Sequence, residues 1–130
     1  MKVLSLREPW VSAVRDGHLD FVGLRYRPGR RAGGRPVALR TQPVRPLEAD
    51  LALYSRLGYL WEPWTALGSV LLVCSFGVVV RTHLAGERAR LVAPPGGFVA
   101  YVRGVRPLAM PHRTSARDVT YLELGLGEPR

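Results

Sequence analysis

The feature that most constrains the fold is the longest apolar stretch of the chain, VLLVCSFGVVV at residues 70–80. Ser75 and Gly77 interrupt it and Arg81 follows it, so it is shorter than the ~20 apolar residues that a membrane-spanning helix requires. Its β-branched content predicts a long or bent buried strand over residues 68–84, with a bulge or bend at Gly77. The rest of the chain is expected to fold around this strand.

Shorter elements are predicted on both sides of this stretch. Alternating or β-branched segments predict strands at 3–7, 21–26, 36–41, 98–103 and 119–124. Helical spacing predicts helices at 9–15 and 47–57, which end near Gly17 and Gly58. Turn-rich or irregular composition marks 27–35 and 59–67 as loops, while the charged residues 87–90 and the turn 93–97 separate two strands.

The number and order of these elements indicate a fold class. Five or six short strands with two helices leave too few crossover helices for a parallel α/β sheet. Short strands with bulge glycines and frequent turns favour a small curled or closed sheet. We therefore expect a compact α+β barrel that forms a single domain over residues 1–130, a common domain size.

The charge is unevenly distributed along the chain. The formal net charge is +9, and residues 1–45 hold ten Lys/Arg against three Asp/Glu, whereas residues 46–130 hold nine against seven. Arginine supplies all but one of these cations, and its planar guanidinium suits phosphate oxygens and base edges. This balance favours an anionic partner, most plausibly nucleic acid, although solvated arginine-rich loops give the same composition.

Other residue types exclude several classes of site. The single Cys74 lies inside the apolar stretch and is expected to act as a small buried hydrophobe. Three dispersed histidines have no Cys or carboxylate at ligand spacing, so no metal site and no cofactor is expected. Arg7, Glu8 and Pro9 interrupt what would be the apolar core of a secretory signal, so the expected location is cytoplasmic.

Four stretches follow one another in an order typical of a known family. The first is REPW at 7–10, which corresponds to an Arg-Gln-Pro-Trp-like turn into a helix, and the second is GHLDFVGLR at 17–25, which partly follows a Gly-x-Lys-x-x-Glu-x-Arg-like motif. The later two are LGSVLLVCSFGVVV at 67–80 and FVAYVRGVRPLAMP at 98–111. Together they resemble the ASCH family, which is related to the PUA RNA-binding fold. The resemblance implies a small PUA-like β-barrel.

The chain departs from this family where catalysis is concerned. Hydrolytic members are thought to use the lysine and glutamate of the motif, but the matching positions here are Leu19 and either Val22 or Gly23. None of these side chains transfers a proton. The aligned arginine is retained as Arg25, so the resemblance implies binding more than catalysis, and no catalytic residue is assigned.

The leading hypothesis is an RNA-binding or modified-nucleoside-binding module with an arginine-rich cleft. The residues expected to bind the nucleic acid are Arg7, Trp10, Arg25, Tyr26, Arg27 and Arg40. Trp10 has two open roles, because it shares an apolar helix face with Ala13 and Val14 and can either pack inward or stack on a base.

Two alternatives come from other classes. One is a small hydrolase of an acylated nucleoside or of RNA, with relocated catalytic groups such as Asp20, Thr41 or Glu62. The other is a protein-interaction module in which the basic charge serves only solubility. Asp20 and Glu8 could also act as an acid and base pair, but among so many arginines they are expected to form salt bridges. The sequence leaves the ligand and the oligomeric state open.

Overall fold

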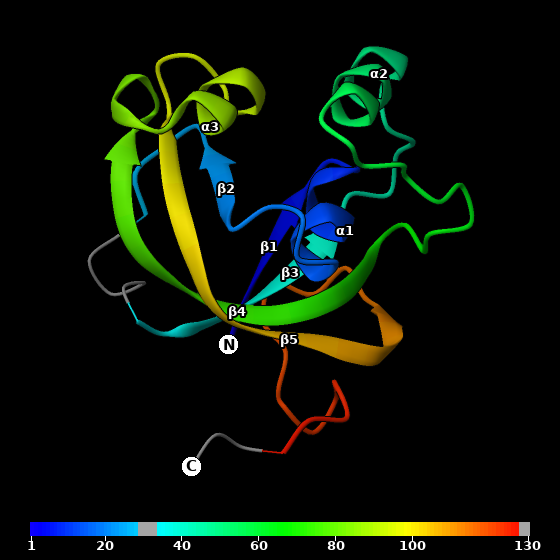
Figure 1. Cartoon of the computed structure of the whole chain (residues 1–130). Coiled ribbons are helices and arrows are strands. Elements are labelled where there is room, and N and C mark those ends of the chain that lie inside the picture. Colours follow the sequence, from blue (N-terminus) through cyan, green and yellow to red (C-terminus); the bar gives the residue numbers. More distant parts are fainter. Residues whose placement is uncertain (29–33, 128–130) are drawn as a thin grey trace.

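The computed structural model describes residues 1–28 and 34–127, and Figure 1 shows their arrangement. The strands are β1 (Lys2–Leu6), β2 (Phe21–Leu24), β3 (Pro36–Thr41), β4 (Ser69–Arg81) and β5 (Phe98–Arg113). The helices are α1 (Trp10–Arg15), α2 (Glu48–Arg56) and α3 (Glu87–Val92), with a 3₁₀ turn η2 (Thr82–Leu84) after β4. No helix within the described ranges is long and apolar enough to cross a membrane.

The strands form one mixed sheet in the order β1-β3-β4-β5-β2. β1 is parallel to β3, and every other neighbouring pair is antiparallel. The sheet curls around α1, as Figure 1 shows. The α+β class is therefore confirmed, but β1 and β2 lie at opposite edges of the sheet and are not hydrogen-bonded to each other, so the predicted barrel is a curled open sheet.

Irregularities in the longest strand pair explain the curl. β4 pairs with β5 along its whole length, and the register shifts between Val70 and Leu72, between Val73 and Ser75, and between Phe76 and Val79. Such bulges bend a strand and increase its twist. Gly77 lies inside the last of these shifts, which confirms the bend that the sequence predicted there.

The concave face of the sheet packs on α1. Val11, Ala13 and Val14 of this helix are at most 1% exposed and belong to the larger hydrophobic core, together with Leu39 and Leu72 of the sheet. Cys74 lies in the same core, where burial raises the pKa of its thiol to about 12. The buried role predicted for this cysteine is confirmed.

The opposite face of the sheet has a second, smaller core. Ala38, Val70 and Val73 pack there against Val119 and Leu124 of the C-terminal segment. This segment is not the strand predicted at residues 119–124, because its pairing with β1 is limited to a single bridge between Lys2 and Asp118. The alternation of apolar residues there reflects packing onto the sheet.

Two further elements differ from the sequence-based expectation. Residues 87–92 form α3 instead of a charged connection, and this helix has only one buried residue, Ala89, and so no apolar stripe that could predict it. β5 continues to Arg113 instead of ending at Arg103, because β4 supplies a hydrogen-bonding partner over that length. Most of the loop predicted at 27–35 lies outside the described residues.

Trp10 fixes α1 to the neighbouring strand β2. Its indole Nε1 donates to the carbonyl oxygen of Phe21 at 3.0 Å, and its ring meets the Phe21 ring edge-on at a centroid distance of 6.3 Å. A Cβ added at Gly23 would lie 2.5 Å from Trp10 Cη2, so the indole fills the space that this glycine leaves. Of the two roles considered for Trp10, this geometry is that of a packing residue.

We expect Trp10→Ala to lower the free energy of unfolding by about 3–5 kcal/mol, because removing a large packed side chain leaves a cavity. The matched control is Trp64→Ala, whose side chain is 78% exposed. This surface substitution should change the stability by no more than about 0.5 kcal/mol. Urea denaturation followed by circular dichroism measures both, and equal effects of the two substitutions would contradict the packing role.

Candidate functional site

The six residues predicted to bind nucleic acid fall into two groups in the structure. Trp10 and Arg40 are partly buried and have internal hydrogen-bond partners. The exposed residues are Arg7, Arg25, Tyr26 and Arg27. Arg7 follows β1 and the other three follow β2, and these are the two edge strands of the sheet. The structure therefore does not bring all six residues together in one cleft.

Arg40 holds two distant parts of the chain together. Its Nε donates to the carbonyl oxygen of Thr114, just beyond β5, and its Nη1 donates to Ser5 Oγ of β1 at 3.1 Å. A half-buried guanidinium with such acceptors stabilises the fold, because leaving either acceptor unpaired is costly. Its partners lie far from it in sequence, which is why local sequence reasoning assigns it to the ligand.

The segment Arg25-Tyr26-Arg27 presents a stacking ring between two cations. The side chain of Tyr26 is 79% exposed, and both arginines are exposed as well. Exposed aromatic rings interleaved with arginines are typical of surfaces that bind single-stranded nucleic acid. Of the predicted site residues, these three and Arg7 remain accessible to a ligand.

Most of the positive charge is not neutralised within the fold. Across residues 1–28 and 34–127, the one ion pair joins Arg15 Nε to Asp16 Oδ1 at 2.9 Å. The guanidinium of Arg81 lies 5.5 Å from the centre of the Phe98 ring, a cation–π arrangement. A surface with this excess of positive charge attracts polyanions over several ångströms.

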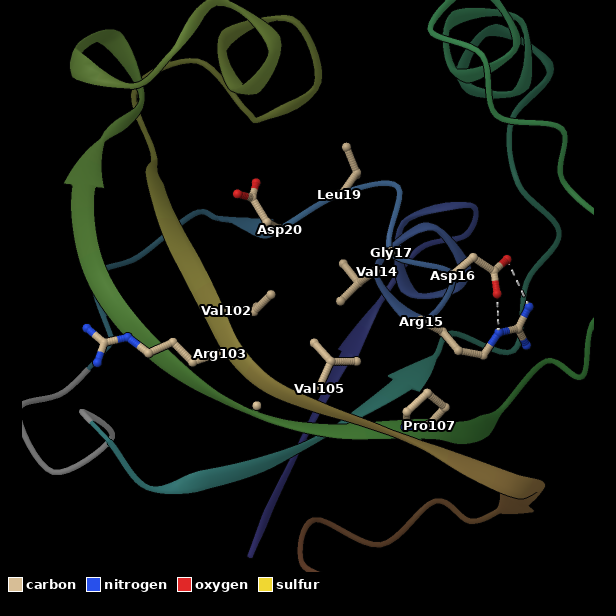
Figure 2. A pocket seen from close by; sticks show the side chains of 11 residues that line it. Val14, Arg15, Asp16, Gly17, Leu19, Asp20, Val102, Arg103, Val105 and Pro107 are labelled. Atoms are coloured by element: carbon tan, nitrogen blue, oxygen red, sulfur yellow. Dashed lines mark hydrogen bonds and ion pairs between the residues drawn. The ribbon is translucent and has the colours of Figure 1, made fainter.

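A shallow pocket of about 390 Å³ lies between the C-terminal end of α1 and β5. Figure 2 shows that Val14, Val102 and Val105 form its apolar floor, while Asp20 lies at its rim. Leu19 also lines this pocket. The Arg103 guanidinium turns away from the pocket across β4, where a Cβ added at Gly77 would collide with it.

Asp16 organises the opposite rim of the pocket. Its carboxylate accepts hydrogen bonds from Arg15 Nε at 2.9 Å and from Tyr59 Oη at 2.7 Å. Partial burial raises the pKa of Asp16, but the hydrogen bonds from Arg15 and Tyr59 outweigh it, so the pKa is lowered overall. Asp16 is therefore ionised at neutral pH, and it ties this rim to the segment that carries Tyr59.

The buried acid Glu8 is a feature that the sequence did not reveal. Glu8 is 1% exposed, and its carboxylate accepts hydrogen bonds from Ser12 Oγ at 2.8 Å and from the Ser12 backbone N at 3.2 Å. Burial raises the pKa of Glu8 to about 7, against the opposing effects of Ser12 and Arg15. The expected salt bridges of Glu8 and Asp20 are absent from the described residues.

Two more polar groups surround this acid. Trp61 Nε1 is near enough to lower the pKa of Glu8 but forms no hydrogen bond of normal geometry, and Tyr54 Oη is buried without a partner. The only local signals for this cluster were the four-residue spacing of Glu8 and Ser12 and a serine on an apolar helix face. Tyr54 and Trp61 are distant in sequence, so the cluster could not be predicted from the REPW turn.

A carboxyl group with a pKa near 7 beside a hydroxyl has the chemistry of a general base and nucleophile pair. Glu8 and Ser12 are both buried, however, so a substrate does not reach them in this conformation. The relocated groups considered for a hydrolase do not assemble either. Thr41 Oγ1 donates to the Ala66 carbonyl oxygen at 2.8 Å inside the fold, whereas Glu62 and Asp20 are exposed.

We expect the stability of the protein to fall as the pH rises from about 4.5 to about 7. The pKa of Glu8 is about 7 in the folded chain and 4.5 when unperturbed, so the folded state holds this proton more tightly. The contribution of Glu8 to the free energy of unfolding is fully present below pH 4.5 and is lost by about pH 7, a change on the order of 3 kcal/mol. Urea denaturation at a series of pH values measures it.

Glu8→Gln removes the titrating group and retains its shape. We expect this variant to lose the pH dependence between 4.5 and 7, while Glu62→Gln, which changes an exposed carboxylate, should retain it. An unchanged pH profile in Glu8→Gln would show that another group is responsible.

Comparison with known proteins finds a likeness to solved structures. No protein-family model and no curated protein matches the chain. The chain is similar to the crystal structure of ASCH from Zymomonas mobilis at 15% sequence identity, over 84% of this chain and 70% of that chain, with a TM-score of 0.47.

Proposed function

We propose that this protein binds RNA or a nucleotide-like ligand through its exposed arginines. The observation that carries this proposal is the segment Arg25-Tyr26-Arg27, in which a 79% exposed aromatic ring lies between two exposed cations. Stacking of a base on such a ring contributes about 1–3 kcal/mol, and the flanking arginines bind phosphates.

The pocket beside α1 supports a second contact with the same ligand. Its volume of about 390 Å³ and its apolar floor suit a small planar group, and the exposed Asp20 carboxylate at its rim accepts hydrogen bonds from an exocyclic amino group. Asp20 and Arg25 lie at the two ends of β2, about 16 Å apart for an extended chain. A short oligonucleotide would therefore contact the pocket and the arginines together.

The choice of RNA over DNA rests on the resemblance of the sequence motifs to the ASCH family and its PUA kinship. Charge and stacking alone do not distinguish the two nucleic acids. The test is a fluorescence anisotropy titration with a short single-stranded RNA pool over a range of salt concentrations. If contacts with phosphates dominate binding, the logarithm of the affinity falls linearly with the logarithm of the salt concentration.

Substitutions then locate the binding surface. We expect Tyr26→Ala to weaken binding by about 1–3 kcal/mol. Arg25→Ala combined with Arg27→Ala should reduce the salt slope by about 0.7 for each phosphate that is no longer bound. Arg56→Ala is the matched control, because it removes one exposed cation of α2 and should leave the slope unchanged. Absence of binding at low salt would overturn the proposal.

Arg7→Ala tests whether the surface extends to the other edge strand. Arg7 is exposed at the end of β1, so its replacement should reduce affinity with little change in melting temperature.

The alternative function is hydrolysis of an acylated nucleoside, which the contact between Ser12 Oγ and the Glu8 carboxylate favours. We expect no efficient turnover of N-acylcytidine, because Leu19 and either Val22 or Gly23 occupy the motif positions and the Glu8–Ser12 pair is buried. The purified protein is incubated with N-acylcytidine, and the cytidine released from this substrate is measured by chromatography. Turnover that Glu8→Gln or Asp20→Ala abolishes would establish the hydrolase instead.

A further inference from the structure

The part of the chain that covers Glu8 is loosely attached to the sheet. It consists of α2 and the connector, which we define as residues 57–68. In Figure 1, α2 stands apart from the curled sheet, and its one buried residue is Tyr54. No regular element of the described chain packs extensively against α2. Segments with few buried apolar contacts open at low free-energy cost.

Polar and aromatic contacts hold the connector in place at its outer edge. Tyr59 Oη donates to Asp16, and the Tyr59 ring lies 5.1 Å from the His18 ring. Arg88 of α3 donates to the Leu57 carbonyl oxygen at 3.5 Å and also contacts the His18 ring. These contacts join the connector to α1 and α3. The apolar contacts of the connector with the larger core come from Tyr59 and Trp61.

At its inner edge, the connector covers the buried acid. Within the described residues, the polar groups that interact with Glu8 are Ser12 and Arg15 of α1, Tyr54 of α2, and Tyr59 and Trp61 of the connector. Arg15 is the only cation among them, and it is already paired with Asp16. Trp61 Nε1 and Tyr54 Oη lack partners in this closed arrangement. An ionised Glu8 would therefore be poorly compensated under the connector.

We propose that α2 and the connector form a flap that is closed over protonated Glu8 and opens when Glu8 ionises. Opening admits water to the carboxylate and to the two unpartnered groups of Tyr54 and Trp61, so it removes the cost of burying them. It also separates Tyr59 from Asp16, which lines the pocket beside α1. The contact between Tyr59 and the pocket rim at Asp16 is therefore present at low pH and lost at high pH, whichever ligand the pocket binds.

Hydrogen exchange of the full chain, followed by mass spectrometry, tests the flap. After correction for intrinsic exchange rates, the equilibrium constant for opening of residues 57–68 should increase about tenfold from pH 6 to pH 8. This increase is expected because the pKa of Glu8 is about 7 when the flap is closed and falls to 4.5 when the flap is open. Glu8→Gln should show no increase, and Glu62→Gln should behave like the unaltered chain. Peptides of β4 should remain protected throughout.

The direction of the effect separates Glu8 from His18. Partial burial and contact with Arg88 lower the pKa of His18, so its protonation would loosen the connector as the pH falls. Opening that increases toward low pH, or that persists unchanged in Glu8→Gln, overturns the proposal, as does opening without any pH dependence.

A second measurement avoids any folding defect of the Glu8 variant. In a Trp64→Phe chain, the remaining indoles are Trp10 and Trp61, of which only Trp61 lies on the connector. Quenching of fluorescence by acrylamide should increase between pH 6 and pH 8 as Trp61 becomes accessible. In a Trp61→Phe, Trp64→Phe chain the increase should disappear. An increase that survives there would assign the change to Trp10 and contradict the flap.

Discussion

Burial of β4 on both of its faces is the constraint on which the rest of the structure depends. Leu72 and Cys74 face the core around α1, whereas Val70 and Val73 face the core beneath the C-terminal segment. A strand with apolar residues on both faces is stable only when both are covered. The short helix α1 covers one face and the C-terminal segment covers the other.

The free edge of β5 has its own safeguards. β2 pairs with β5 only over Phe98–Tyr101, and the Val102 amide then donates to the Asp20 carbonyl oxygen. Beyond that point, no strand of the described chain lies on this side of β5. Pro107 and Pro111 lack N–H groups, so they hinder the addition of a foreign strand. The curled sheet remains open without presenting a continuous edge for aggregation.

The sequence predicts elements whose signals are local and misses those that depend on distant partners. The strand predicted at 36–41 has the bounds of β3, and α1 ends before Gly17, whose φ of +75° suits glycine. The helix at 87–92 has no apolar stripe, and the second half of β5 contains Gly104 and two prolines that locally indicate a break. Pairing with β4 overrides that signal, and pairing is not visible in a local pattern.

The same distinction applies to the candidate site. The exposure of Tyr26 and its neighbouring arginines follows from a local run of polar and turn-forming residues. Local reasoning places Arg40 at the ligand because its acceptor at Thr114 lies 74 residues away. It likewise expects Glu8 in a salt bridge, because the burial of this acid depends on Tyr54 and Trp61, which arrive from a different part of the chain.

The second, smaller core also determines the order in which parts of the chain are covered during synthesis. Val3 N donates to the Arg117 carbonyl oxygen and Val119 N donates to the Met1 carbonyl oxygen, so the C-terminal segment joins the first strand. Until residues 117–124 leave the ribosome, Val70 and Val73 have no cover on that face. The nascent chain thus exposes one face of its central strand to chaperones and to other chains until this segment emerges from the ribosome.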